Sequence, residues 1–239
     1  MPLVACIAAV TATALVARSR KAQVPVKNLV QLPYIEELKA KAEQGDAQAQ
    51  CNLAEAYALG KGVVKDDVEK AKWYRNAAYQ GNEAAQYALG CAYSHGEGVP
   101  KDAIEAVKWW LRSAHQGDLF SAQSSLGCAY YKGEGVAKDQ LEAVKWWRKA
   151  AEQGDSKSQY DMGHVYEYGE GVPKDMVEAY KWYNLSAATG IETAKQGRAR
   201  LESQMTSEQI AEAQKLSREF NPRKQLLADH SGHRAGDNF

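Results

Sequence analysis

A seven-residue stretch that occurs in four copies most strongly limits how this chain can fold. The sequence "GEGVPKD" stands at Gly96–Asp102 and again at Gly169–Asp175, and close copies begin at Gly60 and Gly133. The starting positions 60, 96, 133 and 169 give spacings of 36, 37 and 36 residues. Self-similarity at such a period is typical of structural repeats stacked in an array.

Each copy lies between two segments that have the pattern of amphipathic helices. Upstream segments such as "LGCAYSHG" at 89–96 place Leu, a small residue and Tyr at i, i+3 and i+4, which indicates one face of a helix. Downstream segments such as "EAVKWWRKAA" at 142–151 carry alanines on both sides of a tryptophan, and small residues let helices approach closely. We therefore predict an all-α fold whose repeating unit is helix A, a glycine corner, helix B and a short return.

The residues after each corner predict how helix B begins. The Asp at the end of each corner is followed three residues later by a Glu, and this pair resembles a capping box. A Lys follows three residues after the Glu, and these two side chains can form an ion pair along the helix. The four sets are Asp66, Glu69 and Lys72; Asp102, Glu105 and Lys108; Asp139, Glu142 and Lys145; and Asp175, Glu178 and Lys181. This pattern favours a turn with a capped helix, with the first glycine of each corner ending helix A in a left-handed conformation.

The same residues argue against nucleotide, metal and nucleic-acid sites. A phosphate loop needs Lys followed by Ser or Thr, but here Lys is always followed by Asp, whose carboxylate would repel a phosphate. HExxH, CxxC, EF-hand and Ser-x-x-Lys spacings are absent from the sequence. With 30 basic and 30 acidic residues the net charge is zero, which does not suit a polyanion partner. We predict no catalytic residues, no cofactor and no metal.

The combined pattern resembles the Sel-one-like repeat, a branch of the tetratricopeptide-like helical arrays. The motif "AQ…LG..Y..GEGV.KD…EAVKWW.KAAEQGD" and its flanking helices cover about residues 34–220. The resemblance implies a right-handed α-solenoid and the function of an adaptor or regulator that holds other proteins. It leaves two alternatives open: a β-lactamase-like or penicillin-binding member, and a scaffold associated with an envelope polysaccharide. The cysteine-rich subfamily to which β-lactam hydrolysis belongs bridges helix A to helix B, and here no helix B contains a cysteine.

The array is expected to span 33–220 between two segments of different character. The repeats fall at about 45–80, 81–116, 117–153 and 154–189, with a helix from Pro33 before them and a cap at 190–220 that contains a capping box at Thr206 and Gln209. Residues 1–32 are an apolar leader and linker, in which the uncharged run 1–17 predicts export or a membrane anchor more than a cytoplasmic protein. We expect 221–239 to be a disordered tail.

Three aromatic columns recur in phase with the repeats. The helix A tyrosines are Tyr57, Tyr93, Tyr130 and Tyr166, and the first helix B column is Trp73, Trp109, Trp146 and Trp182. Identical recurrence favours packing in the core over stacking on a ligand. The second helix B column, which is Tyr74, Trp110, Trp147 and Tyr183, lies 100° further round the helix, and we expect it to be partly exposed.

A face of helix A that varies between repeats is the predicted recognition surface. Counting from the framework Leu or Met of helix A, positions −5, −1, +2 and +6 share one face opposite the framework. Because stacked helices A line the concave groove of such solenoids, we predict that this face binds a protein or peptide. Its residues are Gln48, Asn52, Glu55, Leu59, Ala84, Ala88, Cys91, His95, Ser121, Ser125, Cys128, Lys132, Lys157, Asp161, His164 and Tyr168. The alternative is an unconstrained solvated face.

Overall fold

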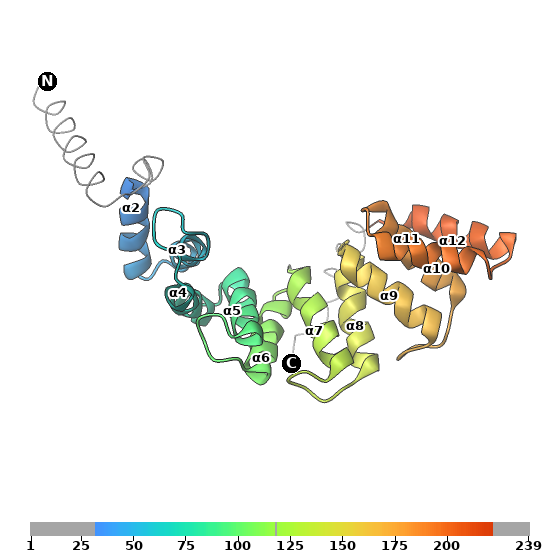
Figure 1. The fold of residues 1–239 in the computed structure, drawn as a ribbon, viewed down its shortest axis with the longest axis horizontal. Helices are drawn as coiled ribbons and strands as arrows, with labels where there is room; N and C mark the ends of the chain where they lie inside the picture. Colours follow the sequence, from blue (N-terminus) through green and yellow to red (C-terminus); the bar gives the residue numbers. More distant parts are fainter. Residues whose placement is uncertain (1–31, 118, 222–239) are drawn as a thin grey trace, which may run out of the picture. The chain divides into compact units, whose positions relative to one another are not determined.

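The computed structural model describes residues 32–117 and 119–221 and is entirely helical within them. This confirms the predicted all-α class, and the helices follow one another through short turns (Figure 1). The helices are α2 (Leu32–Glu43), α3 (Ala47–Leu59), α4 (Asp67–Tyr79), α5 (Glu83–His95), α6 (Ala103–Ala114), α7 (Phe120–Lys132), α8 (Gln140–Glu152), α9 (Ser156–Tyr168), α10 (Met176–Ala188), α11 (Glu192–Glu202) and α12 (Ser207–Glu219).

The chain divides into two compact units, which are described separately. Unit 1 ends at Lys101 and holds α2 to α5, and unit 2 begins at Asp102 and holds α6 to α12. Helices A are α3 and α5 in unit 1 and α7 and α9 in unit 2, while α4, α6, α8 and α10 are helices B. Within each unit, helix A packs most closely on the helix B that follows it, as α3 does on α4, α7 on α8 and α9 on α10.

Each helix A ends at the first glycine of the corner, as predicted. Gly133, for example, has φ +78° and ψ 33°, and its amide donates to the carbonyl of Ala129 at 2.8 Å. The corner closes where the Asp139 amide donates to the carbonyl of Tyr130 at 2.9 Å. The left-handed conformation at this position explains why glycine recurs there, since a Cβ is unfavourable in that region.

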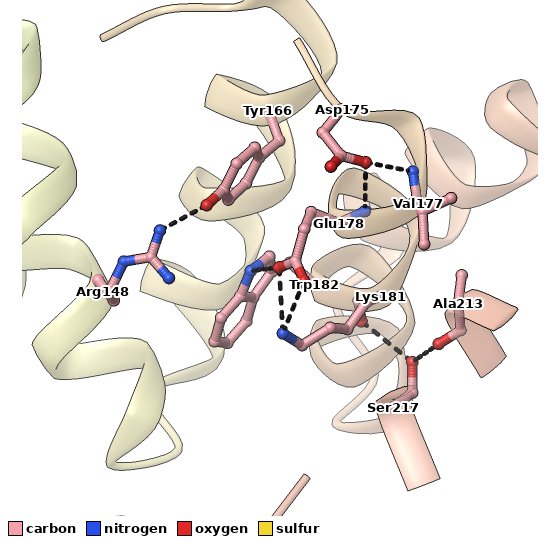
Figure 2. A network of polar contacts seen from close by, with 9 residues as sticks. All are labelled: Arg148, Tyr166, Asp175, Val177, Glu178, Lys181, Trp182, Ala213 and Ser217. Carbon is pink, nitrogen blue, oxygen red and sulfur yellow. Dashed lines mark hydrogen bonds and ion pairs between the residues drawn. The ribbon is translucent and has the colours of Figure 1, made fainter. Parts of the chain in front are cut away.

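Helix B begins with the predicted aspartate, but the following glutamate acts differently from the prediction. Asp175 accepts hydrogen bonds from the amides of Val177 and Glu178 at 2.9 and 3.0 Å (Figure 2). The Glu178 carboxylate faces along the helix, where it pairs with Lys181 and accepts from Trp182 Nε1 at 3.0 Å. The prediction that this glutamate reaches back to the start of the helix is therefore wrong. Its partners are the Lys181 ammonium group and the Trp182 indole, three and four residues further along the helix.

The aspartate cap of α6 is expected to stabilise the fold. Asp102 accepts from the amides of Ile104 and Glu105, both at 3.0 Å, at the start of α6. We expect Asp102→Ala to lower the free energy of unfolding by about 1 kcal/mol, because two helix amides lose their acceptor. Asp102→Asn, which keeps an acceptor oxygen, should lose less. Urea denaturation of both variants measures the difference, and equal losses would show that the carboxyl charge rather than the acceptor stabilises the helix.

The two aromatic columns of helix B differ less than the sequence predicts. In the first, Trp109, Trp146 and Trp182 are buried, as expected for core residues, and Trp73 is half-buried.

In the second column, Trp147 and Tyr183 are only 4% and 0% exposed, and Trp110 is buried as well. The prediction of partial exposure is therefore wrong for these three residues, whereas Tyr74 is half-buried. The reason is close helix packing: a Cβ on Gly127 would lie 2.3 Å from the Trp147 indole, and one on Gly163 would lie 2.5 Å from the Tyr183 ring. Each glycine thus leaves room for the ring against the helix A backbone.

Polar contacts also join the helices of unit 2, within a repeat and between repeats. The buried Gln159 side chain donates to the carbonyl of Ala151 at 3.2 Å, which ties α9 to the end of α8. Within the third repeat, Gln153 at the end of α8 donates to Gln123 of α7 at 2.9 Å. Arg148 of α8 donates to the hydroxyl of Tyr166 on α9 (Figure 2). The bonds of Gln159 and Arg148 thus connect helix B of the third repeat to helix A of the fourth.

The predicted capping box of the last described helix is present. Thr206 and Gln209 form it reciprocally at the start of α12. The Ser217 hydroxyl of α12 lies 2.8 Å from the carbonyl of Ala213 and 3.4 Å from that of Lys181 on α10 (Figure 2). α12 therefore packs on the last helix B and covers it.

Two predictions fall outside this description. The leader and linker were predicted at 1–32 and the tail at 221–239, and all of these residues except Leu32 and Asn221 lie outside the described ranges. Of the helices in 32–117 and 119–221, none is both long and apolar enough to span a membrane.

Candidate binding groove on helices A

The predicted recognition residues are all accessible in the structure. They lie on α3 and α5 in unit 1 and on α7 and α9 in unit 2. The exposed ones are Gln48, Glu55, Leu59, Ala84, His95, Lys132, Lys157 and Tyr168. The half-buried ones are Asn52, Ala88, Cys91, Ser121, Ser125, Cys128, Asp161 and His164. The framework residues of the same helices, Leu53, Leu89, Leu126 and Met162, are each 0% exposed.

In unit 1 the face borders a shallow hollow between α2 and α3. The hollow contains about 460 Å³ and is partly apolar. Its lining includes Tyr34, Leu38, Asn52, Glu55, Leu59 and Lys61. Two large apolar side chains beside it, Tyr34 and Leu59, are 58% and 63% exposed. Tyr34 belongs to the N-terminal helix and was not among the predicted residues.

In unit 2 polar bonds hold α7 and α9 side by side. The buried hydroxyl of Ser158 donates to that of Ser124 at 3.0 Å. At the other end of the helices the Tyr131 hydroxyl donates to Glu170 Oε2 at 2.8 Å, and His164 Nδ1 lies 3.4 Å from the same oxygen. These contacts hold α7 and α9, which carry the candidate residues of unit 2, next to each other.

A second network joins α9, α10 and α11. The Glu167 side chain is 7% exposed and accepts two hydrogen bonds from Arg200, both at 2.7 Å, and one from the Tyr183 hydroxyl at 2.8 Å. Burial alone would raise the pKa of Glu167, but the hydrogen bonds from Arg200 and Tyr183 hold it below its ordinary value. Glu167 is thus an ionised and fully bonded structural carboxylate.

Asp161 is the one candidate carboxyl group with a very different environment. Its Oδ2 is buried and has no hydrogen-bond partner among the described residues. Burial raises the pKa of Asp161 to about 7, in spite of the opposing charges of Lys157 and Lys132. Near neutral pH the side chain is therefore present in both neutral and ionised forms.

The thiols near this surface are poorly suited to act as nucleophiles. Burial raises the pKa of Cys51 to about 11, and burial also raises the pKa of Cys128. A reactive cysteine instead needs a lowered pKa, since the thiolate is the attacking form. Within the described ranges no group of three or more His, Cys, Asp and Glu side chains is arranged to hold a metal ion.

Sequence reasoning missed the groups that surround the predicted face. Tyr131 directly follows Tyr130 of the recurring tyrosine column and Glu170 belongs to the corner, and no repeat pattern assigns either of them to the face. Arg200 lies in the half unit after the fourth repeat, where the alignment of repeats gives no counterpart. The extra tyrosine of "AYYKG" at 129–133 is the only signal that could have pointed to one of them.

The chain is similar in sequence and structure to proteins of known structure. One relative is a protective antigen present in uropathogenic Escherichia coli strains, whose crystal structure displays an SLR fold. The two sequences are 44% identical and the structures superpose with a TM-score of 0.65. The match covers 67% of this chain and 34% of the antigen. A Sel1 repeat protein from Oxalobacter formigenes is 34% identical with a TM-score of 0.65, over 72% of this chain and 50% of the other. The chain thus spans about a third to a half of these proteins. No curated protein matches it.

A family model adds the residue ranges. The model described as Sel1 repeat matches 47–82, 83–118, 120–155 and 156–190, which together are more than half of the chain. Sel1 repeat proteins generally mediate protein–protein interactions and are generally non-catalytic scaffolds. With four matched repeats in an all-helical fold, this chain belongs to the Sel1 repeat family.

Proposed function

We propose that this chain is a non-enzymatic scaffold that binds a protein or peptide on the varying faces of its helices A, which are α3 and α5 in unit 1 and α7 and α9 in unit 2. One observation carries the proposal: on the same helices Leu53, Leu89, Leu126 and Met162 are each 0% exposed, whereas the sixteen varying residues are all exposed or half-buried. A surface whose residues differ from repeat to repeat can present a different contact at each step along a partner.

The kinds of side chain on this face support binding. Leu59 and Tyr168 are 63% and 55% exposed, and His164 stacks beside Tyr168 with ring centroids 4.7 Å apart. Exposed aromatic and aliphatic side chains with polar neighbours are typical of residues that anchor a partner.

The hydrolase and polysaccharide alternatives have no supporting contact in the described residues. For a β-lactamase-like activity, the raised pKa of the Cys128 thiol is unfavourable to nucleophilic attack. Turnover of a chromogenic β-lactam by the purified chain would replace the scaffold proposal with the first alternative, and selective capture on a glycan array would replace it with the second.

The proposal predicts where a partner can be crosslinked. We expect a photoreactive amino acid at Tyr168 or Leu59 to crosslink a partner in native extract, because both positions lie on the proposed face. A matched probe at Leu141, which is 54% exposed in the first turn of helix B α8, should give little product. Mass spectrometry of the products compares the three positions.

A charge change tests the same face independently. Glu55 is exposed and lies one helical turn before Leu59, so Glu55→Lys should reduce crosslinking from Leu59 and leave thermal unfolding unchanged. Equal product at Leu141 and at the two groove positions, or no effect of Glu55→Lys, would contradict binding along helices A.

A further inference from the structure

The first described helix, α2, corresponds to a helix B. Gln50 of α3 donates to the carbonyl of Ala42 on α2 at 3.0 Å. The same bond joins Gln159 of α9 to the carbonyl of Ala151 on α8. In α2, α4, α6, α8 and α10 alike, the glycine of the return follows three residues after this alanine, which sets one register for all five. Within the part of the chain that the structure describes, the array therefore opens at a helix B that has no helix A before it.

Tyr34 of α2 occupies a position that is covered wherever a helix A precedes helix B in the same unit. Its counterparts Lys70 of α4, Ala143 of α8 and Ala179 of α10 are 8%, 0% and 0% exposed, whereas Tyr34 is 58% exposed. The helices that pack on these three helices B are α3, α7 and α9. The exposure of Tyr34 therefore marks the place of the helix A that α2 lacks.

Two adjoining hollows form one groove along α2 and α3, the α2–α3 groove. The hollow of about 460 Å³ continues into a second one of about 230 Å³, since Tyr34, Leu38 and Asn52 line both. The groove extends from Asp46 at the start of α3 to Lys61 beyond its end. The 13 residues of α3 rise by about 20 Å, so the groove is as long as one helix A.

In unit 2 the corresponding place beside α8 and α9 is filled by α7. Gly127 of α7 packs against the indole of Trp147, which is the counterpart of Leu38. The Tyr131 ring of α7 lies on the same indole with ring centroids 5.3 Å apart. An amphipathic helix with small and apolar side chains on one face is thus the element that fits between a helix B and the next helix A.

The end of the groove at Lys61 carries two unpaired charges. In the last corner the counterpart of Lys61 is Glu170, which accepts a hydrogen bond from Tyr131 of α7 at 2.8 Å. Lys61 and Glu55 both line the groove, and neither forms an ion pair with any described residue. A helix that carries one acidic and one basic side chain beside its apolar face would complement both charges.

The repeat register does not supply this helix from the chain itself. One repeat length of 36 residues before the buried Ala54 and Ala56 of α3, the sequence has Arg18 and Arg20. Arginines at such positions would be buried without partners, which is costly. A second copy does not offer the helix either, because the framework faces of α3, α5, α7 and α9 are buried within their own array.

We propose that the α2–α3 groove binds an amphipathic helix of the partner protein, seated where a preceding helix A would pack. The inference rests on the proposed function, since Asn52, Glu55 and Leu59 of the proposed face line this groove. The bound helix places small and aliphatic side chains against Tyr34 and α3, and charged side chains of both signs beside Glu55 and Lys61. Such a helix-in-groove contact extends the array by one helix.

Fluorescence anisotropy with the full chain and a labelled peptide of the α7 sequence, Phe120–Lys132, tests the inference. The peptide carries Cys128→Ser, Tyr131→Glu to face Lys61, and a hydrocarbon staple away from Leu126, because isolated helices of this length are marginal in water. We expect saturable binding. A stapled peptide of scrambled sequence, and one that also carries Leu126→Asp, should not bind.

Substitutions in the chain locate the binding site. Tyr34→Asp and Leu59→Asp should each weaken binding by about tenfold or more, the usual scale for an anchor residue, and leave thermal unfolding unchanged because both side chains are exposed. Val68→Asp, at a 64% exposed residue of α4, is the matched control and should change little. Lys61→Glu should weaken binding by about tenfold, whereas Lys65→Glu in the same corner should have little effect.

A photoreactive amino acid at Tyr34 of the full chain, without peptide, tests the other occupants. A product that joins position 34 to residues 1–31 of the same chain would show that the chain fills the groove itself, and a product between two chains would show a second copy. Either result overturns the inference. Absence of peptide binding, or equal binding in Tyr34→Asp and Val68→Asp, also overturns it. Crosslinking from Tyr168 on α9 then decides separately whether helices A bind a partner at all.

Discussion

Replacing Gly135 by alanine is expected to destabilise the fold by about 2–5 kcal/mol, the sum of a left-handed conformation and an overpacked contact. Gly135 is the second glycine of the corner between α7 and α8 and has φ +76°. A Cβ there would lie 2.1 Å from the carbonyl oxygen of Ala103, at the first residue of α6. Because the obstructing atom belongs to the backbone, no side-chain rotation relieves the contact, and the corner or α6 must move.

Gly190→Ala is the matched control for this substitution. Gly190 has φ +97° and lies in the return between α10 and α11, and a Cβ there would meet no atom within 4 Å. The free energy of unfolding of this control variant should fall only by the cost of the left-handed conformation, about 1–2 kcal/mol. Five of the six tryptophans lie at or after Trp109, so tryptophan fluorescence in urea reports mainly on unit 2. Equal losses in the two variants would show that the close approach to Ala103 contributes nothing.

The features predicted correctly from sequence depend on near neighbours in the chain. Gly133 ends α7 in a left-handed conformation and Asp139 caps α8, and both roles involve residues within about one turn. Such local signals are complete in the sequence, since backbone conformation and capping need no knowledge of the other helices. The helix order and corners could therefore be predicted before any packing was known.

The features predicted wrongly or missed depend on distances between helices. Trp147 is buried because Gly127 lets α8 approach α7, and the sequence showed that glycine only as a recurring framework position. Glu178 could reach either the helix start or Trp182, and two choices of similar energy cannot be ranked from spacing.

The candidate site shows the same division. Asp161 occupies the same repeat position as Asn52 and Ser125, so the sequence could place it on the predicted face. Burial raises the pKa of Asp161 to about 7, and burial of a single side chain depends on the packed helices around it, which no repeat pattern reveals.

Arg200→Met is expected to lower the free energy of unfolding by about 3 kcal/mol at neutral pH, near the lower end for breaking a buried ion pair. Glu167 is 7% exposed in its side chain, whereas the Arg200 side chain is 46% exposed, which moderates the cost. Methionine keeps much of the aliphatic length but no charge, so Glu167 would remain buried with only the Tyr183 hydroxyl as a partner. Chemical denaturation followed by tryptophan fluorescence measures the loss.

The pH dependence of Arg200→Met identifies the cause. In the parent chain the pKa of Glu167 lies below its ordinary value of 4.5, so the pair stabilises the fold above that pH and loses its effect as the pH falls. Without Arg200, burial raises the pKa of Glu167, and ionisation then costs stability as the pH rises. The deficit of the variant should therefore grow from about pH 4 to about pH 7. Adding Glu167→Gln should recover most of the loss and remove this slope, because the double variant buries no unpaired charge. A deficit that is independent of pH and persists in the double variant would instead mean that Arg200 stabilises α11 through packing alone.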